Sequence, residues 1–226
     1  MSSGSSRWPE LFVEALRIID DVPPERMLGP IPWTFGGGTA LALQIGHRVS
    51  FDVDLFVPGT SLMEFRPPRN RAARELLSRG IASMQHPGHY LRYELPFGEI
   101  DFLSPALQIE NGWRPMVVLD RNVAVETPEE IATKKVRYRG GRLKARDVFD
   151  IACIEAAGYD LAKVFAEHVP DVMQIALASM DRLDALGGAD LIYADVTPTE
   201  SGGEQMAGAM SAARRLFERV LSVSAP

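Results

Sequence analysis

The sequence predicts an α+β fold: a small mixed sheet flanked by helices over residues 1–125, then a helical domain over residues 126–226. Three observations predict it. A glycine-rich turn at Gly36–Gly38 joins a short apolar run to strong helix formers, as in a strand–turn–helix unit. Residues 90–103 alternate apolar and polar side chains around a turn, which is typical of a β-hairpin. From Thr127 onward, apolar residues recur at helical spacing.

The first elements follow from apolar spacing and from the residues that end them. Apolar side chains within Leu11–Val22 form one helical face, and a proline pair stops that helix. The apolar run Ile31–Phe35 predicts a short strand. The helix after the glycine turn begins near Thr39 and ends at Gly46, because glycine is common just past the end of a helix.

Two acids flank the start of the next apolar run, Asp52-Val53-Asp54. Residues two apart in a strand share a face, so both carboxylates point the same way. Adjacent carboxylates repel each other unless a cation lies between them, and Mg²⁺ suits such a pair while leaving positions open for phosphates. The N–H groups of the glycine turn and the helix start can bind those phosphates, which predicts a site for a nucleoside triphosphate and a metal ion. Two solvated surface acids beside an ordinary turn are the plainer alternative.

A third acid lies on the predicted hairpin, whose strands are Tyr90–Leu95 and Glu99–Leu103. Asp101 faces away from its apolar neighbours. If this hairpin packs beside the strand with the two acids, Asp101 joins Asp52 and Asp54 in a three-carboxylate cage for metal ions. An acid on a wet strand face is the alternative.

Two further features complete the first part of the chain. A predicted helix over Phe65–Gly80 carries five arginines and one glutamate, so it is either a surface for a polyanion or a solvated helix face. Met116–Leu119 and Val123–Val125 predict a strand pair at the edge of the sheet.

The helical part begins at Thr127, where Pro128 and Glu130 complete a capping box. Between Lys134 and Arg146 lie seven basic residues and no acidic one, a run that needs an anionic partner or strong screening. The next helix carries Asp147 and Asp150 three residues apart, on one face. Later helices are predicted over Ala156–Val169, Val172–Leu186 and Met206–Leu221, with a loop at Thr197–Gly203. We expect this domain to complete the active site and to shape an acceptor groove.

Composition excludes several classes of protein. With 46% hydrophobic residues and no apolar stretch near the length of a membrane span, the chain is predicted to be an ordinary globular protein. The start of the chain lacks the apolar core of a signal peptide, and the single cysteine, Cys153, fits a reducing cytoplasm. Four scattered histidines argue against a zinc site. A net charge of −6 argues against a protein that coats nucleic acid, although a local basic groove is compatible with it.

Two strings resemble a known family. The first reads GGTALALQIGHRVSFDVDLF and resembles the G-[G/S]-x(9–13)-D-x-D signature of polymerase-β-like nucleotidyltransferases, with thirteen residues between Gly38 and Asp52. More narrowly, it is similar to the AbiEii/AbiGii nucleotidyltransferase family, which includes toxins of type IV toxin–antitoxin systems. The second reads IATKKVRYRGGRLKARDVFDIA and looks like the second conserved block of that family. The turn here reads Gly-Gly-Thr, whereas many members have Gly-Ser, and Thr39 can still present a hydroxyl.

The resemblance also implies roles for individual residues. The triphosphate would be held by Gly37, Gly38 and Thr39, and we assign Arg48 and Ser50 to the same nucleotide site. Mg²⁺, or Mn²⁺ in its place, would be held by Asp52, Asp54 and Asp101. Catalysis would involve Asp52 and Asp54 together with Lys134 or Lys135, Asp147 and Asp150. A lysine can neutralise the β- and γ-phosphates as pyrophosphate leaves. Asp150 can orient that lysine, contact the nucleoside or act as a base. An ion pair between Arg146 and Asp150 within a solvated basic turn is the structural alternative.

The reaction implied by the resemblance is transfer of a nucleoside monophosphate from an NTP to an acceptor hydroxyl, with release of pyrophosphate. The implied acceptor is the 3′ end of a tRNA, the outcome is growth arrest, and the implied partner is a cognate antitoxin. The basic residues favour RNA over an aminoglycoside. A transferase of the same fold acting on a small molecule or a protein side chain, a non-catalytic NTP-binding module, and transfer of the γ-phosphate remain alternatives.

Overall fold

The computed structural model of the chain describes residues 6–27 and 31–223. The first five residues, which belong to the stretch where a signal peptide would begin, lie outside the described residues. The chain forms two compact units. The first contains Met1–Ala40, Ser50–Leu107 and Trp113–Glu126; the second contains Leu41–Val49, Gln108–Gly112 and Thr127–Pro226. The two segments 41–49 and 108–112 therefore belong to the unit that otherwise starts at Thr127. Within the described residues, no helix is long and apolar enough to cross a membrane.

The first unit is built on one mixed sheet, which confirms the predicted α+β class. Its strands are β1 (Thr34–Gly36), β2 (Val53–Phe56), β3 (Ser83–Gln85), β4 (Tyr90–Leu95), β5 (Gly98–Leu103), β6 (Trp113–Val118) and β7 (Arg121–Glu126), in the order β3-β4-β5-β2-β1-β7-β6. The pairs β1–β7 and β2–β5 are parallel and the others are antiparallel. The predicted hairpin is confirmed as β4 and β5.

The core of this unit lies where the sheet meets α1 (Trp8–Asp20), which contacts β2 and β5. Alternation sets the buried face of the sheet: Val53 and Leu55 are fully buried, while Asp54 between them is not. The rings of Phe12 and Phe35 lie 4.8 Å apart and join the helix to β1. Residues two apart along a strand share a face, so burying one set presents the acid to the other side.

The predicted helix over Phe65–Gly80 is wrong in its first half. A 3-10 segment, η2 (Gly59–Phe65), comes first, and α3 spans only Arg71–Ser78. The reason is Pro67-Pro68, because the residue before a proline avoids the helical region, and Arg66 is accordingly extended with φ −89° and ψ 151°. Asn70 restarts the helix by accepting a hydrogen bond from the Ala73 N–H at 2.8 Å.

The second strand pair was only partly predicted. β6 lies at the edge of the sheet, as expected, whereas β7 lies between β6 and β1 and is an inner strand. The short strand β3 at the other edge was not predicted. A strand's place in a sheet depends on long-range pairing, which local alternation does not encode.

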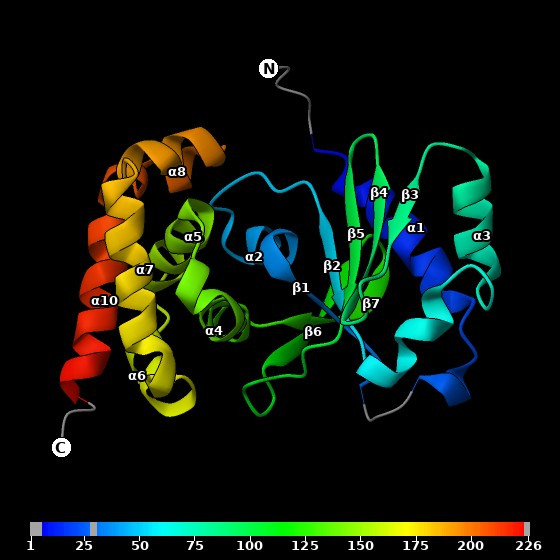
Figure 1. Cartoon of the computed structure of the whole chain (residues 1–226), viewed down its shortest axis with the longest axis horizontal. Helices are drawn as coiled ribbons and strands as arrows, with labels where there is room; N and C mark the ends of the chain where they lie inside the picture. The colour runs from blue at the N-terminus through cyan, green and yellow to red at the C-terminus, as the bar shows by residue number, and fades with distance from the viewer. Residues whose placement is uncertain (1–5, 28–30, 224–226) are drawn as a thin grey trace. The chain divides into compact units, whose positions relative to one another are not determined.

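The second unit is helical, as predicted (Figure 1). Besides the end of α2 (Gly37–Ile45), it contains α4 (Pro128–Arg139), α5 (Ala145–Ala156), α6 (Leu161–His168), α7 (Met173–Ala185), α8 (Ala189–Asp195), α9 (Glu200–Gly203) and α10 (Ala209–Val223). The last helix packs against α5, α6 and α7. The helix predicted from Ala156 starts later, at Leu161, because Gly158 breaks the chain with φ +93°. The predicted loop at 197–203 contains the short helix α9.

The predicted capping box at the start of α4 is half formed. The Thr127 hydroxyl oxygen accepts a hydrogen bond from the Glu130 N–H at 3.3 Å, as expected. The Glu130 carboxylate, however, accepts from the N–H groups of Gln108 and Ile109, at 2.9 and 2.8 Å. Glu130 is completely buried, so its carboxylate serves to hold the 108–112 segment against α4. Burial raises the pKa of Glu130, and these two N–H groups with Lys134 oppose that rise.

Candidate active site

The glycine turn of the first unit leaves room for a carboxylate. Gly36 ends β1 and Gly37 begins α2, with φ +67°, a conformation that favours glycine. A Cβ atom at Gly37 would lie only 1.9 Å from Oδ2 of Asp54. Asp54 therefore lies directly against the turn, at the N-terminus of a helix whose first N–H groups have no partners within the helix itself. Any larger residue at position 37 would displace Asp54.

Sheet pairing brings the acids of different strands together. In the antiparallel pair β1–β2, Asp54 is the partner of Gly36, and in the parallel pair β2–β5 it is the partner of Asp101. Asp54 and Asp101 thus stand side by side on neighbouring strands, as the sequence predicted for a hairpin packed beside the D-x-D strand. Asp52 lies just before β2, and its Oδ1 accepts a hydrogen bond from the Glu99 N–H at 3.1 Å.

Asp101 has a cationic partner in this structure. Arg92 donates from Nε to Oδ1 of Asp101 at 2.8 Å and from Nη2 to Oδ2 at 2.7 Å, a two-pronged pair. The hydrogen bond to Asp101 raises the pKa of Arg92. Arg92 also lies 2.8 Å from Glu99. The third carboxylate of the predicted cage is therefore held by an arginine.

These contacts bear on whether the residues fit a metal ion. The described part of the chain holds no group of three or more His, Cys, Asp and Glu side chains arranged to bind one. Asp52 and Asp54, one residue apart, supply the hard oxygen ligands that Mg²⁺ prefers, and Asp54 lies at the turn expected to hold phosphates. The pair fits a metal ion that also binds a triphosphate, whereas Asp101 could join only if Arg92 moved away.

Thr39 and Ser50, two other residues assigned to the nucleotide, are buried and each takes part in a hydrogen bond between a side chain and the backbone. The Thr39 hydroxyl donates to the carbonyl oxygen of Asp52, and Thr39 is 2% exposed. This bond ties the first turn of α2 to the D-x-D segment. Ser50 is also buried, and its carbonyl oxygen accepts from the Ser6 hydroxyl at 2.5 Å.

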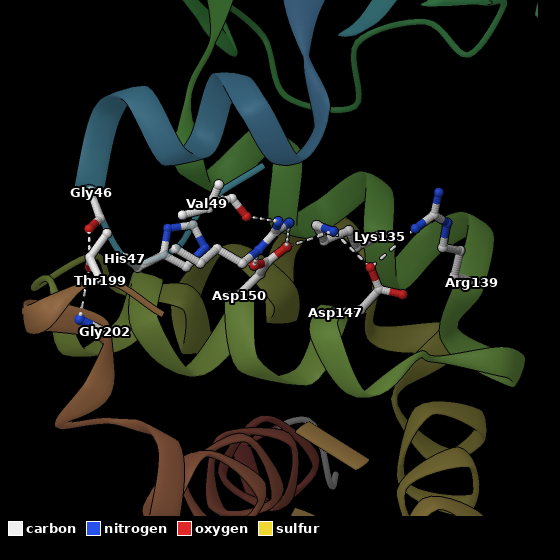
Figure 2. A network of polar contacts seen from close by, with 10 residues as sticks. Gly46, His47, Val49, Lys135, Arg139, Asp147, Asp150, Thr199 and Gly202 are labelled. Carbon is white, nitrogen blue, oxygen red and sulfur yellow. Dashed lines mark hydrogen bonds and ion pairs between the residues drawn. The ribbon is translucent and has the colours of Figure 1, made fainter. Parts of the chain in front are cut away.

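A buried charge network occupies the second unit (Figure 2). Nζ of Lys135 lies 2.7 Å from Oδ1 of Asp147 and 2.9 Å from Oδ2 of Asp150. Arg139 extends the network, since its Nη1 lies 3.1 Å from Asp147. Figure 2 shows Lys135 between the two aspartates, with Arg139 beyond Asp147 and His47 beyond Asp150. The lysine comes from α4 and the aspartates from α5, so the network holds these helices together.

Asp150 is the most heavily contacted member. Arg48 donates to it from Nε at 2.6 Å and from Nη2 at 3.0 Å, and Nε2 of His47 lies 2.7 Å from Oδ1. The expected alternative, an Arg146–Asp150 pair, is not formed, and Arg48 takes that place. Asp150 and Asp147 are both completely buried, so their charges depend on these partners.

The partners set the protonation of both aspartates. Burial by itself would raise the pKa of Asp150, but the charges of Lys135 and Arg48 and the hydrogen bonds from His47 and Arg48 hold it well below its usual value. For Asp147, burial is likewise overcome by Lys135 and Arg139, and its pKa is lowered. Both carboxylates are therefore ionised at neutral pH.

The two candidate lysines have different partners. Lys135 joins Asp147 and Asp150, whereas Lys134 lies 3.5 Å from Glu130, the acid that holds the 108–112 segment. Both lysines are buried, at 5% and 9% exposure for Lys134 and Lys135. Sequence left the choice open because adjacent residues on a helix point about 100° apart, and only packing shows which one meets the aspartates.

His47 and Arg92 were not among the site residues selected from the sequence, and Arg139 entered only as one of the seven basic residues between Lys134 and Arg146. His47 follows the glycine that ends α2, and its neighbour Arg48 was selected, but nothing local shows that an isolated histidine will be buried against an acid. Arg92 carries a signal that could have been used, because it faces Asp101 across the predicted hairpin.

Comparisons with known proteins identify the family and the fold of the chain. The family model described as "Nucleotidyl transferase AbiEii toxin, Type IV TA system" matches residues 28–190, well over half of the chain. A comparison with curated protein sequences found no match. Among solved structures, the chain is similar to MenT4, described as the nucleotidyltransferase toxin Rv2826c from Mycobacterium tuberculosis H37Rv, with a TM-score of 0.53 and 17% identity over 94% of this chain and 83% of that one. It is also similar to JHP933 from Helicobacter pylori, with a TM-score of 0.50 and 16% identity over 98% and 95% of the two chains. At these identities the likeness concerns the fold.

Proposed function

Since the chain belongs to the AbiEii family of nucleotidyl transferase toxins of type IV toxin–antitoxin systems, we propose that it transfers a nucleoside monophosphate from an NTP to the 3′ hydroxyl of an RNA such as tRNA. The acceptor oxygen forms a bond to the α-phosphorus, the bond between that phosphorus and the pyrophosphate oxygen breaks, and the hydroxyl proton is released. A cognate antitoxin is the expected partner of the toxin, in the cytoplasm.

The observation that carries this proposal is the position of Asp54. Its carboxylate rests on Gly37 in the turn that starts α2, and it pairs in register with Asp101. The turn that we assign to the phosphates and the acid that we assign to the metal therefore lie against each other in the first unit. Gly37 and Gly38 present N–H groups to the triphosphate, and Thr39 fixes that turn to the backbone of Asp52.

We assign the metal to Asp52 and Asp54, with Asp101 as a third ligand once Arg92 releases it. Bound Mg²⁺ or Mn²⁺ would supply charge neutralisation at the triphosphate and activation of the acceptor hydroxyl. Until then Arg92 neutralises the charge of Asp101 through the ion pair in which Nη2 lies 2.7 Å from Oδ2. A metal ion bound to Asp52 and Asp54 would stabilise the folded first unit, because a ligand that binds only the folded state shifts the unfolding equilibrium.

The second unit supplies Lys135 and Asp150. Lys135 is the lysine whose charge is assigned to the departing pyrophosphate, and Lys134, beside Glu130, has a structural role. Of the three roles open to Asp150, orienting Lys135 is favoured, because its oxygens are already contacted by Lys135, Arg48 and His47 and it has no exposed surface. Asp147 holds Lys135 from its other side.

An RNA acceptor is favoured by three basic side chains of the second unit. Arg142 and Lys144 are exposed and Arg146 is half-buried, and none of the three makes an ion pair with a residue in the described part of the chain. Lys144 caps α5 and Arg146 lies in its first turn, at the positive end of the helix dipole, where cations are unfavourable. Phosphates of an RNA backbone would relieve that cost. The arginines around α3 differ, because Arg69 pairs with Glu64 and Arg79 pairs with Glu14. These ion pairs favour the interpretation of that segment as a solvated face.

The test uses each of the four NTPs labelled at the α-phosphate, Mg²⁺ and bulk tRNA. We expect label on RNA with the wild-type protein, and none with the Asp52→Asn/Asp54→Asn double variant or after EDTA, with recovery when Mg²⁺ is restored. Label on the protein itself would replace the RNA acceptor by a protein side chain. Metal-dependent NTP binding by calorimetry with no transfer from any NTP would contradict the proposal and favour a binding module or a small-molecule acceptor.

A further inference from the structure

A segment near the C-terminus holds the chain on either side of His47. The Val49 N–H donates to the Thr197 carbonyl oxygen at 2.9 Å, and the Thr199 N–H donates to the His47 carbonyl oxygen at 3.1 Å. Arg48 and Pro198 form an antiparallel bridge between these two bonds. The Thr199 hydroxyl donates to the Gly46 carbonyl oxygen, as Figure 2 shows. Two segments 153 residues apart in sequence are thus paired through their backbones. We call residues 197–202 the C-terminal clamp.

The clamp packs so closely at Gly202 that there is no room for a side chain. A Cβ atom at Gly202 would lie 1.7 Å from the carbonyl oxygen of His47 and 2.7 Å from its carbonyl carbon. Both are backbone atoms, so they cannot move aside as a flexible side chain would. Thr199 keeps Gly202 in place, because its hydroxyl oxygen accepts from the Gly202 N–H at 3.2 Å as the cap of α9. The neighbouring Gly203 has open space where its Cβ would lie.

The clamped residues are the ones that hold Asp150. His47 and Arg48 lie within the paired stretch, and their side chains make the 2.7 Å and 2.6 Å contacts with Asp150. His47 is 3% exposed, its ring stacks on Phe149 at 5.7 Å, and its other nitrogen, Nδ1, is buried with no hydrogen-bond partner among the described residues. The ring has one polar contact, so its orientation depends on where its backbone is fixed.

We propose that the C-terminal clamp positions the Lys135–Asp150 pair: Thr199 and Gly202 fix the backbone of His47 and Arg48, whose side chains fix Asp150, which in turn orients Lys135. The clamp lies beyond residue 190, where the match to the family model ends. Thr199, Gly202 and His47 are therefore positioning residues. This inference rests on the proposed role of Lys135 and Asp150 in transfer.

The decisive comparison is Gly202→Ala against Gly203→Ala, two additions of one methyl group to the same short helix. The clamp predicts that Gly202→Ala displaces His47 and lowers kcat by on the order of tenfold to a hundredfold, since a misplacement of about 1 Å can cost that much. KM for the NTP should change by less than about twofold, because the glycine turn and the acids of the first unit are untouched. Gly203→Ala should match the wild type in both constants.

A second pair of variants isolates the hydroxyl. Thr199→Ser keeps the bonds to Gly46 and Gly202, and should retain wild-type kcat; Thr199→Val removes both and should lower it. Equal kcat values for Gly202→Ala and Gly203→Ala, in proteins with equal melting temperatures, would overturn the proposal. Equal kcat values for Thr199→Ser and Thr199→Val would also do so.

A readout independent of activity separates this inference from the proposed function. The ring ¹⁵N and ¹H resonances of His47, assigned with His47→Gln, report its contact with Asp150. They should shift in Gly202→Ala and Thr199→Val and stay in place in Gly203→Ala and Thr199→Ser. If no variant, wild type included, transfers nucleotide but the resonances shift as stated, the proposed function fails and the clamp stands. Unchanged resonances in Gly202→Ala would overturn the clamp.

Discussion

Gly37 is a residue at which the backbone conformation and the position of an acid depend on the absence of a side chain. Its φ of +67° suits glycine, and the space that a Cβ would fill is taken by the Asp54 carboxylate. The sequence already indicated a turn for phosphates here and an acid pair some residues later. Their direct contact was not predictable, because it depends on the pairing of Gly36 with Asp54 between β1 and β2.

Substitution at this position tests that contact. Gly37→Ala should abolish detectable transfer, a loss of at least about a hundredfold, because both Asp54 and the turn must move. Gly80→Ala is the matched control, since Gly80 has φ +69° and nothing within 4 Å of its Cβ position. Alanine at either position adds a similar backbone strain of about 1–2 kcal/mol, so the difference in kcat between the two variants reports the contact with Asp54. Similar kcat values for the two would show that Asp54 does not need the glycine.

The two adjacent lysines make a second prediction at the residue scale. Lys135→Met leaves Asp147 and Asp150 buried with fewer cations, which should destabilise the protein by about 3–5 kcal/mol and eliminate transfer. Lys134→Met removes a longer contact, 3.5 Å to Glu130, and should retain measurable transfer. Urea unfolding and label transfer measured on both variants check this. Loss of transfer in Lys134→Met, with Lys135→Met active, would reverse the assignment.

At the scale of elements, local patterns predicted most helices and strands. The predictions were wrong where tertiary contacts determine the position of an element, or where a local signal was passed over. Spacing and caps placed α1, α4, α5, β4 and β5. The proline pair that shortens α3 was visible in the sequence but was passed over, because the arginine pattern on either side reads as one helix. The inner position of β7 was not predictable, since it comes from a parallel pairing with β1.

The candidate site shows the same division. The glycine turn and the carboxylates at 52, 54, 101, 147 and 150 could be selected from spacing and resemblance. The cations that hold the acids could not, since Arg92, Arg48 and His47 meet them across strands or across more than a hundred residues. Burial of a charge is a property of the packed molecule, and single-sequence patterns do not report it.

The network between α4 and α5 predicts how stability depends on pH. The folded-state pKa of Asp150 lies below its unfolded value, so the stabilisation is complete above about pH 4 and is lost as pH falls through the folded pKa. Asp147 acts in the same direction. We expect the free energy of unfolding to fall steeply with acid in that range.

Asp150→Asn should make this dependence shallower, because one titrating carboxylate is gone. Urea unfolding followed by circular dichroism at a series of pH values measures the slope. Glu218→Gln, at an exposed position of α10, serves as the control and should leave the slope unchanged. The same slope for Asp150→Asn and wild type would show that Asp150 does not carry a depressed pKa.

At the scale of the whole molecule, a net charge of −6 coexists with a small basic cluster, Arg142, Lys144 and Arg146, whose side chains form no ion pair with the described residues. An acidic protein is repelled by RNA except where such a cluster faces it. Arg142 and Lys144 are exposed in the second unit, so binding of RNA should depend on them and on salt. The charge distribution therefore gives a prediction that does not involve the catalytic residues.

Charge reversal tests that prediction. Arg142→Glu/Lys144→Glu should weaken binding of labelled tRNA by on the order of tenfold or more at low salt, and should make the logarithmic salt slope shallower by about 2. Arg215→Glu reverses another exposed arginine, on α10, and should have little effect. Fluorescence anisotropy across a salt series measures both quantities. Equal slopes for the double variant and the wild type would place the RNA elsewhere.

The central claim is transfer of a nucleoside monophosphate to an RNA 3′ hydroxyl, and the most direct measurement uses two labels and two RNAs. NTPs labelled at the α- or the γ-phosphate are incubated with protein and Mg²⁺ on intact tRNA or on tRNA whose 3′ end has been oxidised with periodate. We predict α-label on intact tRNA only, with γ-label recovered as pyrophosphate. Attachment of γ-label to RNA, or equal α-label on intact and oxidised tRNA, would contradict the account.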